Sequence, residues 1–137
     1  MRAEKHTYFA LFAASAFLFV CASCSNTGSA VPDGAKIEGE SLIIELEENP
    51  TTGFSWKCDE YDTSILELLE DEYLPASVET DIVGSSGIHH YAFKGLSEGE
   101  TTLTFKYIKA WEGDESAEDT RTFKVVVDQE GAIESIK

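Results

Sequence analysis

Basic residues are scarce in this sequence, and their scarcity limits what the protein can bind. Lys and Arg number 10 against 26 Asp and Glu, which gives the 137 residues a formal net charge of -16 at pH 7. Nucleic-acid binding needs a basic surface opposite the phosphates, so this composition excludes it. The acidic charge favours basic partners, but most of the carboxylates need only keep the protein soluble.

Long apolar runs are equally rare, and the one present lies near the N-terminus. It spans residues 8–20, follows two basic residues and ends in small side chains. A transmembrane helix needs about 20 apolar residues, so this shorter run predicts a signal peptide over residues 1–23. Its exit, Cys-Ala-Ser-Cys, resembles the lipobox of bacterial lipoproteins. The resemblance implies that Cys24 is acylated and anchors the protein in the bacterial cell envelope, on a periplasmic or surface face. Cys21 stands where the lipobox usually has Leu, and an ordinary secretory signal is the alternative.

Cysteine is the third residue in short supply. Once residues 1–23 are removed and Cys24 is acylated, Cys58 is the remaining thiol of the three, so we expect no internal disulfide. The removed segment carries two basic residues and one acidic residue, which takes the net charge from -16 to -17. Residues 24–35 are small and polar with Gly and Pro, as in a flexible tether. Hydrophobic residues at 42% and aromatics at 11% are enough for one packed core, which alone must stabilise the domain.

From residue 36 onward, apolar side chains recur with the period of two that is typical of β-strands. The sets that share one strand face are Leu42, Ile44 and Leu46; Phe54, Trp56 and Cys58; His89, Tyr91 and Phe93; Leu103, Phe105 and Tyr107; and Phe123, Val125 and Val127. Residues 65–73 fit either one helical turn or a strand, and we take them as a strand. Six or seven short strands in about 100 residues predict an all-β domain, an immunoglobulin-like antiparallel β-sandwich over residues 36–128, with a barrel as the alternative. Residues 129–137 are expected to be a frayed tail.

Three segments between these strands have compositions that ordinary sandwich turns do not require. The first consists of Asn49, Pro50, Thr51, Thr52, Gly53 and Phe54. Proline fixes its own φ and pushes the preceding residue into an extended conformation, while glycine permits a left-handed one. The two β-branched threonines have restricted side chains, so the loop is predicted to be a preorganised recognition tip. A plain turn is the alternative, since these residue types are common in turns.

The second segment is a pair of serines between glycines: Gly84, Ser85, Ser86 and Gly87. Such a backbone can approach a partner closely and offer main-chain hydrogen bonds, although a flexible hairpin end has the same composition. His89 and His90 follow it. Neighbours on a strand point to opposite faces, and no Cys or third His supports a ligand set, so no metal site is predicted there.

The third segment, Lys109, Ala110, Trp111 and Glu112, carries a tryptophan out of a strand into an acidic loop. Trp is enriched at binding hot spots, so Trp111 is predicted to contact a partner, whereas Trp56 lies mid-strand and is predicted to belong to the core. Residues 114–119 lack the alternating ligands and central Gly of a calcium loop and are predicted to be a solvated acidic loop.

In this order, the three segments resemble those of the chagasin family of inhibitors of papain-like cysteine proteases. The resemblance covers residues 36–127 and rests on NPTTGF from Asn49, on Trp56, on the glycine-bounded serines, and on Gly99, Leu103, Tyr107 and Trp111-Glu112. It implies an immunoglobulin-like sandwich that presents three adjacent loops as a wedge to the protease cleft. Thr51 and Thr52 would lie over the catalytic Cys and His, the serine loop on the non-primed side and Trp111 on the primed side. Lys109-Ala110 stand where the family commonly has Arg-Pro, which implies a less rigid third loop.

The resemblance thus implies a monomeric, reversible inhibitor that needs no cofactor. A surface adhesion or scaffold domain of the same architecture is the alternative, which the acidic charge and the changed third segment would suit. An enzyme is not expected, because the carboxylates are scattered and no Ser, His and Asp set lies in a recognisable motif.

Overall fold

The computed structural model describes residues 31–76 and 86–137, and this part of the chain is mostly β-structure. Its strands are β1 (Ala35–Glu38), β2 (Ser41–Glu48), β3 (Ser55–Glu60), β4 (Leu66–Pro75), β5 (Gly87–Gly95), β6 (Gly99–Ile108), β7 (Asp119–Val127) and β8 (Ile133–Ile136). The 3-10 helices η1 (Pro50–Thr52) and η2 (Asp114–Ser116) lie in two of the connections. No helix within the described residues has the length and apolar character needed to cross a bilayer.

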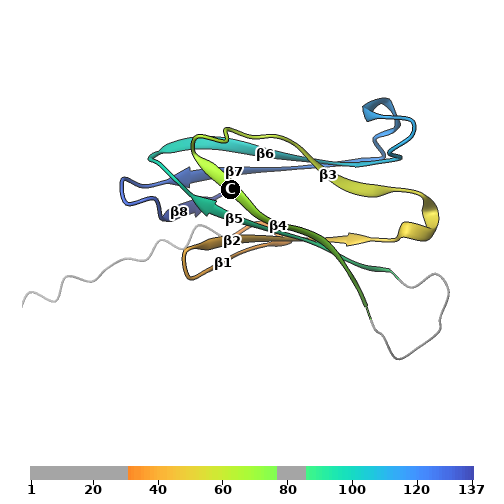
Figure 1. The fold of residues 1–137 in the computed structure, drawn as a ribbon, viewed down its shortest axis with the longest axis horizontal. Helices are drawn as coiled ribbons and strands as arrows, with labels where there is room; N and C mark the ends of the chain where they lie inside the picture. Colours follow the sequence, from red (N-terminus) through yellow and green to blue (C-terminus); the bar gives the residue numbers. More distant parts are fainter. Residues whose placement is uncertain (1–30, 77–85) are drawn as a thin grey trace, which may run out of the picture.

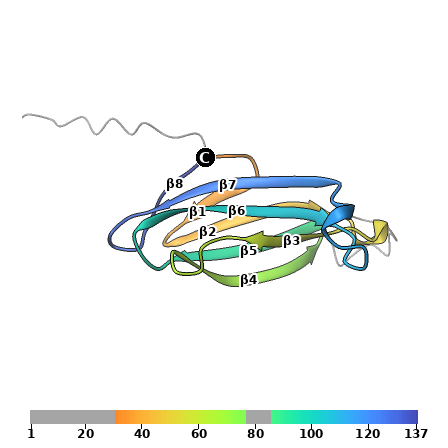
Figure 2. The same cartoon turned by 90° about the horizontal axis from the view of Figure 1, so that it is seen from above.

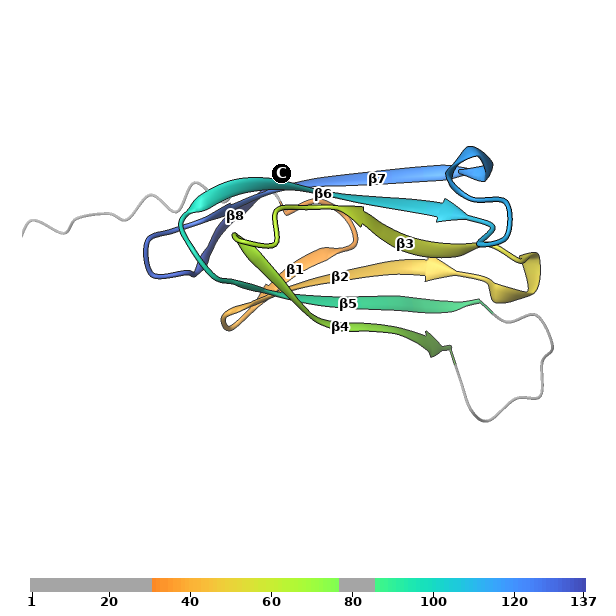
Figure 3. The same ribbon diagram turned by 45° about the horizontal axis from the view of Figure 1, so that its top comes forward.

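The described strands form two antiparallel sheets that pack face to face. One sheet has the order β1-β2-β5-β4 and the other the order β3-β6-β7-β8. Figure 3 shows β7, β6 and β3 in one layer and β2, β5 and β4 in the other. Seen from above in Figure 2, the long strands of both layers run along the same axis of the molecule. Because each sheet keeps two separate edges, the fold is the predicted immunoglobulin-like sandwich and not a barrel.

The core lies between the sheets and follows from the alternation of side chains along each strand. Its buried members include Leu42, Ile44, Leu46, Trp56, Leu66, Tyr91, Phe93, Leu103, Phe105, Phe123, Val125 and Val127. A large apolar side chain stabilises the fold by about 1.5 to 3 kcal/mol when fully buried. Trp56 is therefore in the core as predicted, and Cys58 is a half-buried thiol with no disulfide partner among the described residues.

The register of the two sheets brings three connections to one end of the sandwich. Glu48 at the end of β2 pairs with Gly87 at the start of β5, and Gly87 also pairs with Pro75 at the end of β4. In the other sheet, Ser55 at the start of β3 pairs with Ile108 at the end of β6. Figure 1 shows the β2–β3 and β6–β7 connections side by side at the right-hand end of the molecule.

The stretch that fits either helix or strand, residues 65–73, lies almost wholly in β4. This strand carries a register shift between Leu68 and Glu70, and such a bulge breaks the alternation along the sequence. The described residues hold eight strands instead of the expected six or seven. The two additional strands, β1 and β8, have four residues each, too few for a period to show.

The prediction of a frayed tail over residues 129–137 is wrong. Within this segment β8 pairs with β7 and buries Ile133 and Ile136 in the core. A register shift beside Val127 lets two isoleucines three positions apart face the same side of the sheet. The packed domain therefore extends through Ile136.

Candidate functional site

The connections at the shared end are loop 1 (residues 49–54), loop 2 (residues 76–86) and loop 3 (residues 109–118). Loops 1 and 3 are described in full, and loop 2 at its two ends alone. Of the predicted site residues, Gly84 and Ser85 lie outside the described residues, as does the predicted lipidation site Cys24.

Loop 1 has the backbone that its sequence predicts. Asn49 is extended, with φ -123° and ψ 95°, as expected for a residue that precedes proline. Residues 50–52 form η1, and Gly53 ends it in the left-handed conformation with φ 81°. The N–H groups of Thr52 and Gly53 donate to the carbonyls of Asn49 and Pro50, each over 3.1 Å. The tip is thus a closed turn and not an open connection.

Hydrogen bonds within loop 1 fix both threonine side chains. The Asn49 Oδ1 accepts from the N–H of Thr51 at 3.2 Å and from its hydroxyl at 2.6 Å. The Thr52 hydroxyl donates to the Asn49 carbonyl at 2.7 Å and accepts from the N–H of Phe54 at 3.4 Å. Both threonines are exposed, so the end of the molecule presents two side chains whose orientation is set before any partner arrives.

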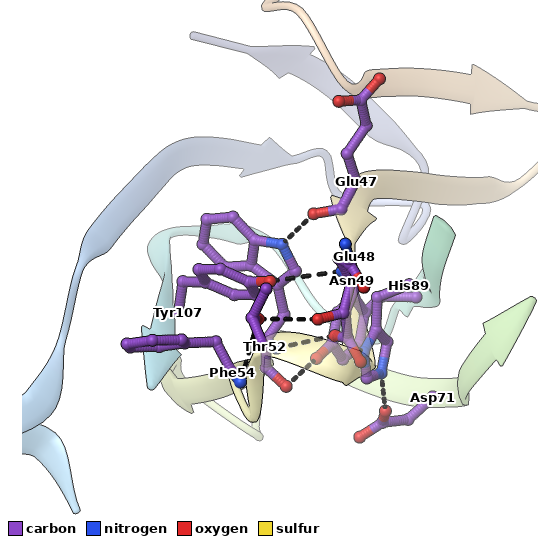
Figure 4. Close-up of polar contacts among 10 residues, drawn as sticks. Glu47, Glu48, Asn49, Thr52, Phe54, Asp71, His89 and Tyr107 are labelled. Carbon is purple, nitrogen blue, oxygen red and sulfur yellow. Dashed lines mark hydrogen bonds and ion pairs between the residues drawn. The ribbon is translucent and has the colours of Figure 1, made fainter. Parts of the chain in front are cut away.

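Side chains from the core hold the base of loop 1. The indole N–H of Trp56 donates to the Glu47 carbonyl at 2.8 Å, and the Trp56 backbone N–H donates to the Glu48 carboxylate at 2.8 Å. The N–H of Asn49 donates to the Tyr107 hydroxyl at 3.3 Å. Figure 4 shows these bonds converging where β2 ends and loop 1 begins. The entry to the tip is therefore tied to both sheets.

A chain of charged groups continues from this base across the first sheet. The Glu48 carboxylate, on a residue only 4% exposed, lies 2.7 Å from the His89 Nδ1. The other ring nitrogen of His89 lies 2.7 Å from the Asp71 carboxylate on β4. Each nitrogen thus has a carboxylate partner, and the chain links β2, β5 and β4 (Figure 4).

Loop 3 packs directly on loop 1. Trp111 is 70% exposed, yet its ring lies so close to Gly53 that a Cβ on that glycine would be 2.5 Å from the Trp111 Cη2. The Lys109 ammonium lies 5.1 Å from the centre of the Phe54 ring, which stacks on Tyr107 at 5.3 Å. Loops 1 and 3 therefore form one continuous surface, in which Lys109 braces loop 1 by a cation–π contact.

Hydrogen bonds and ion pairs stiffen loop 3 in the absence of the proline that the family commonly has. The N–H groups of Glu112 and Gly113 donate to the Lys109 carbonyl at 2.9 and 3.1 Å. The Ser116 hydroxyl accepts from the Lys109 N–H at 3.0 Å and donates to the Gly113 carbonyl at 2.6 Å. Lys106 on β6 pairs with Asp59 at 2.6 Å and with Asp114 of loop 3 at 2.9 Å, and the hydrogen bonds to these two carboxylates raise the pKa of Lys106. The loop is a compact unit fastened to the second sheet.

At the described end of loop 2, Gly87 packs against the protein's own strand and not toward a partner. Ser86 is exposed, but Gly87 is buried and begins β5. A Cβ on Gly87 would lie 2.4 Å from the Leu74 carbonyl and 2.5 Å from the Tyr73 hydroxyl. The close approach predicted for this glycine is therefore to the chain's own β4.

The sequence gives no role to Glu48 and His89, which hold the base of the tip. Both had a signal: Glu48 is in phase with the inward-facing Leu42, Ile44 and Leu46, and His89 is in phase with Tyr91 and Phe93. A charged residue at an inward position needs a polar partner, and here Glu48 and His89 are partners of each other. Within the described residues, no group of three or more His, Cys, Asp and Glu side chains could hold a metal ion.

Comparisons with known proteins agree with this geometry. The chain matches the chagasin family peptidase inhibitor I42 over residues 37–127. It is 32% identical over 76 residues to Amoebiasin-1 of Entamoeba histolytica, covering 54% of this chain and 70% of the relative. It is 28% identical over 91 residues to Chagasin of Trypanosoma cruzi, covering 64% and 79%. The crystal structure of the cysteine protease inhibitor EhICP2 from Entamoeba histolytica superposes with a TM-score of 0.57 at 30% identity, covering 64% of this chain and 78% of that one.

Proposed function

Because the chain belongs to the chagasin family of peptidase inhibitors, we propose that its loop end enters and blocks the active-site cleft of papain-like cysteine proteases. The observation that carries this proposal is the contact of Trp111 with Gly53, which joins loops 1 and 3 into one surface at the end of the sandwich. A related protein with a similar structure is described as a cysteine protease inhibitor. The comparisons give no support to the adhesion or scaffold alternative.

Inhibition by this surface requires rigidity and no covalent chemistry. The exposed Thr51 and Thr52 lie over the catalytic Cys and His of the protease, and their hydrogen-bonded turn offers no peptide bond in near-attack geometry. Loop 2, including Gly84, Ser85, Ser86 and Gly87, contacts the non-primed side. Trp111, with Lys109, Ala110 and Glu112 beside it, contacts the primed side. The threonines and Trp111 are the central anchors of this reversible interface.

A titration of papain with the full chain tests the proposal. We expect inhibition at submicromolar concentration, and the combined variant Thr51→Ala and Thr52→Ala should weaken it by about tenfold or more, which is about 1.4 kcal/mol. The matched control is Thr102→Ala with Thr122→Ala, which removes two exposed threonines from strands of the second sheet. Absence of inhibition by the folded wild-type chain at micromolar concentration would overturn the function. Equal inhibition by the two double variants would show that the tip is not the anchor.

We also propose that the chain is exported and lipid-anchored through Cys24, in a bacterial cell envelope. The support is in the sequence: a basic start, an apolar run over residues 8–20, and the Cys-Ala-Ser-Cys exit that resembles a lipobox. A small, polar tether over residues 24–35 would then separate the inhibitory domain from the bilayer.

A further inference from the structure

Both ring nitrogens of His89 face carboxylates, so the hydrogen bonds that the ring can donate depend on its protonation state. Both ring nitrogens lie 2.7 Å from carboxylate oxygens, Nδ1 from Glu48 and Nε2 from Asp71. A carboxylate can only accept a hydrogen bond, and a neutral imidazole has one N–H to donate. The ring can therefore donate to both carboxylates at once only as a doubly protonated imidazolium. In that state His89 is a cation held between two anions.

Two titratable groups beside His89, Tyr91 and Cys58, have pKa values that burial raises above the physiological range. The Tyr91 ring stacks on the imidazole at 4.5 Å, and burial raises the pKa of Tyr91 well above its usual range. Burial, with Asp71 and Asp59 nearby, raises the pKa of the Cys58 thiol to about 12. Tyr73, the neighbour of His89 on β4, turns its hydroxyl toward Gly87. Cys58 and Tyr91 therefore stay neutral and add no charge beside His89.

Glu48 connects this cluster to the tip. It is the last residue of β2, and its carboxylate also accepts the backbone N–H of Trp56 on β3, at 2.8 Å. One side chain thus joins the strand that enters loop 1 to the strand that leaves it. The carboxylate is buried, so its hydrogen bonds to Trp56 and His89 must compensate for the water that it has lost.

We propose that His89 is a positioning residue for the inhibitory tip and that its charge makes inhibition tightest at acidic pH. When the pH rises and His89 gives up a proton, one nitrogen faces a carboxylate at 2.7 Å without a hydrogen between them. The contacts of His89 with Glu48 and Asp71, which together we call the clamp, join β2, β5 and β4. Loss of the proton weakens this clamp, and the base of loop 1 loses its fixed geometry. A tip that must be ordered on binding binds more weakly than one ordered in advance.

The inference rests on the proposed function, and inhibition constants measured for wild type and His89→Gln test it. Both are measured against the same protease at each pH, so the ratio of the two constants cancels the titration of the enzyme. Glutamine supplies one donor group, its NH₂, and no charge, so we expect a ratio of about ten near pH 5 that falls as the pH is raised to 8. A ratio that is constant over this range would overturn the inference, because a merely structural role has no reason to follow pH.

The chain offers a matched control on the next residue. His90 also lies between two carboxylates, 3.5 Å from Glu45 and 3.3 Å from Glu70, but on the opposite face of the strand. His90→Gln should therefore give a ratio that does not change with pH. A pH-dependent ratio equal to that of His89→Gln would mean that overall charge, and not the clamp, is responsible.

Two further measurements keep the test decisive. If His89→Gln does not fold, Asp71→Asn removes one of the two charges at a half-exposed position, and the fall in inhibition should then occur at lower pH than in wild type. An unchanged pH profile would contradict the clamp. If wild type does not inhibit at any pH, the proposed function fails. If wild type inhibits and the ratios stay flat, the role of His89 alone fails.

Discussion

Gly53 is the residue on which the contact between loops 1 and 3 depends. Its φ of 81° is unfavourable for any other residue, and an added Cβ would reach within 2.5 Å of Trp111. We expect Gly53→Ala to lower the free energy of unfolding by about 1 to 2 kcal/mol through strain. By displacing Trp111, it should also weaken inhibition by more than about tenfold. Chemical denaturation and an inhibition assay measure the two effects separately.

Gly39 provides the control for this substitution. It also has a positive φ, 61°, but nothing lies within 4 Å of the position that its Cβ would occupy. Gly39 lies between β1 and β2, away from the loop end. Gly39→Ala should therefore destabilise the domain to a similar extent and leave inhibition unchanged. If both variants weaken inhibition equally, strain and not the position of Trp111 is the cause.

At this scale the sequence predicts the residues whose effect is local. Pro50 and Gly53 act on their own backbone and that of their neighbours, so the extended Asn49 and the left-handed Gly53 could be predicted without a structure. The inward phase of Glu48 and His89 marks each as buried, but their pairing could not be predicted, because the partners come from three strands and meet only through the register of the sheet. Glu48 and His89 are 41 residues apart, and this separation does not predict a contact.

Among the elements, β8 is a core-forming strand that the sequence analysis did not predict. It pairs with β7 at the edge of the second sheet and contributes Ile133 and Ile136 to the core. We expect Ile136→Ala to lower the free energy of unfolding by about 2 to 4 kcal/mol, since the side chain is fully buried. Chemical denaturation measures the change. Glu134→Ala, at an exposed position on the same strand, should have little effect, and equal effects of the two would show that the strand contributes no packing.

Alternation of apolar residues predicts the long strands and fails at the short or bulged ones. β2, β5, β6 and β7 have eight or more residues each, and their inward sets could be identified from the period of two. In β8, the isoleucines are separated by an odd number of positions, which on a regular strand would place them on opposite faces. The register shift against β7 places both isoleucines on the same face, and a strand of four residues is too short for the sequence to predict such a shift.

For the molecule as a whole, the proposed lipid anchor decides where inhibition takes place. Acylation adds about 0.8 kcal/mol of membrane affinity for each buried CH₂, so several chains hold a small domain firmly. We expect the chain expressed in a bacterium to enter the detergent phase on Triton X-114 partition. Cys24→Ser should move it to the aqueous phase without changing inhibition of the protease.

Cys21→Ser is the control for this experiment, because it alters the same segment and leaves the proposed acylation site intact. This variant should still enter the detergent phase. Recovery of Cys24→Ser in the detergent phase would show that Cys24 does not carry the anchor. The inhibitory domain itself is unaffected by either outcome, since its core and loops 1 and 3 lie in the part of the chain that follows Ala35.

The chain's two tryptophans lie in contrasting surroundings. Trp56 is buried between the sheets, and Trp111 stands out at the end of the molecule against Gly53. Indole fluorescence depends on contact with water, so the emission of Trp56 should change when the domain unfolds and that of Trp111 when a partner covers the loop end. The domain thus carries its own optical reporters, one of folding and one of docking.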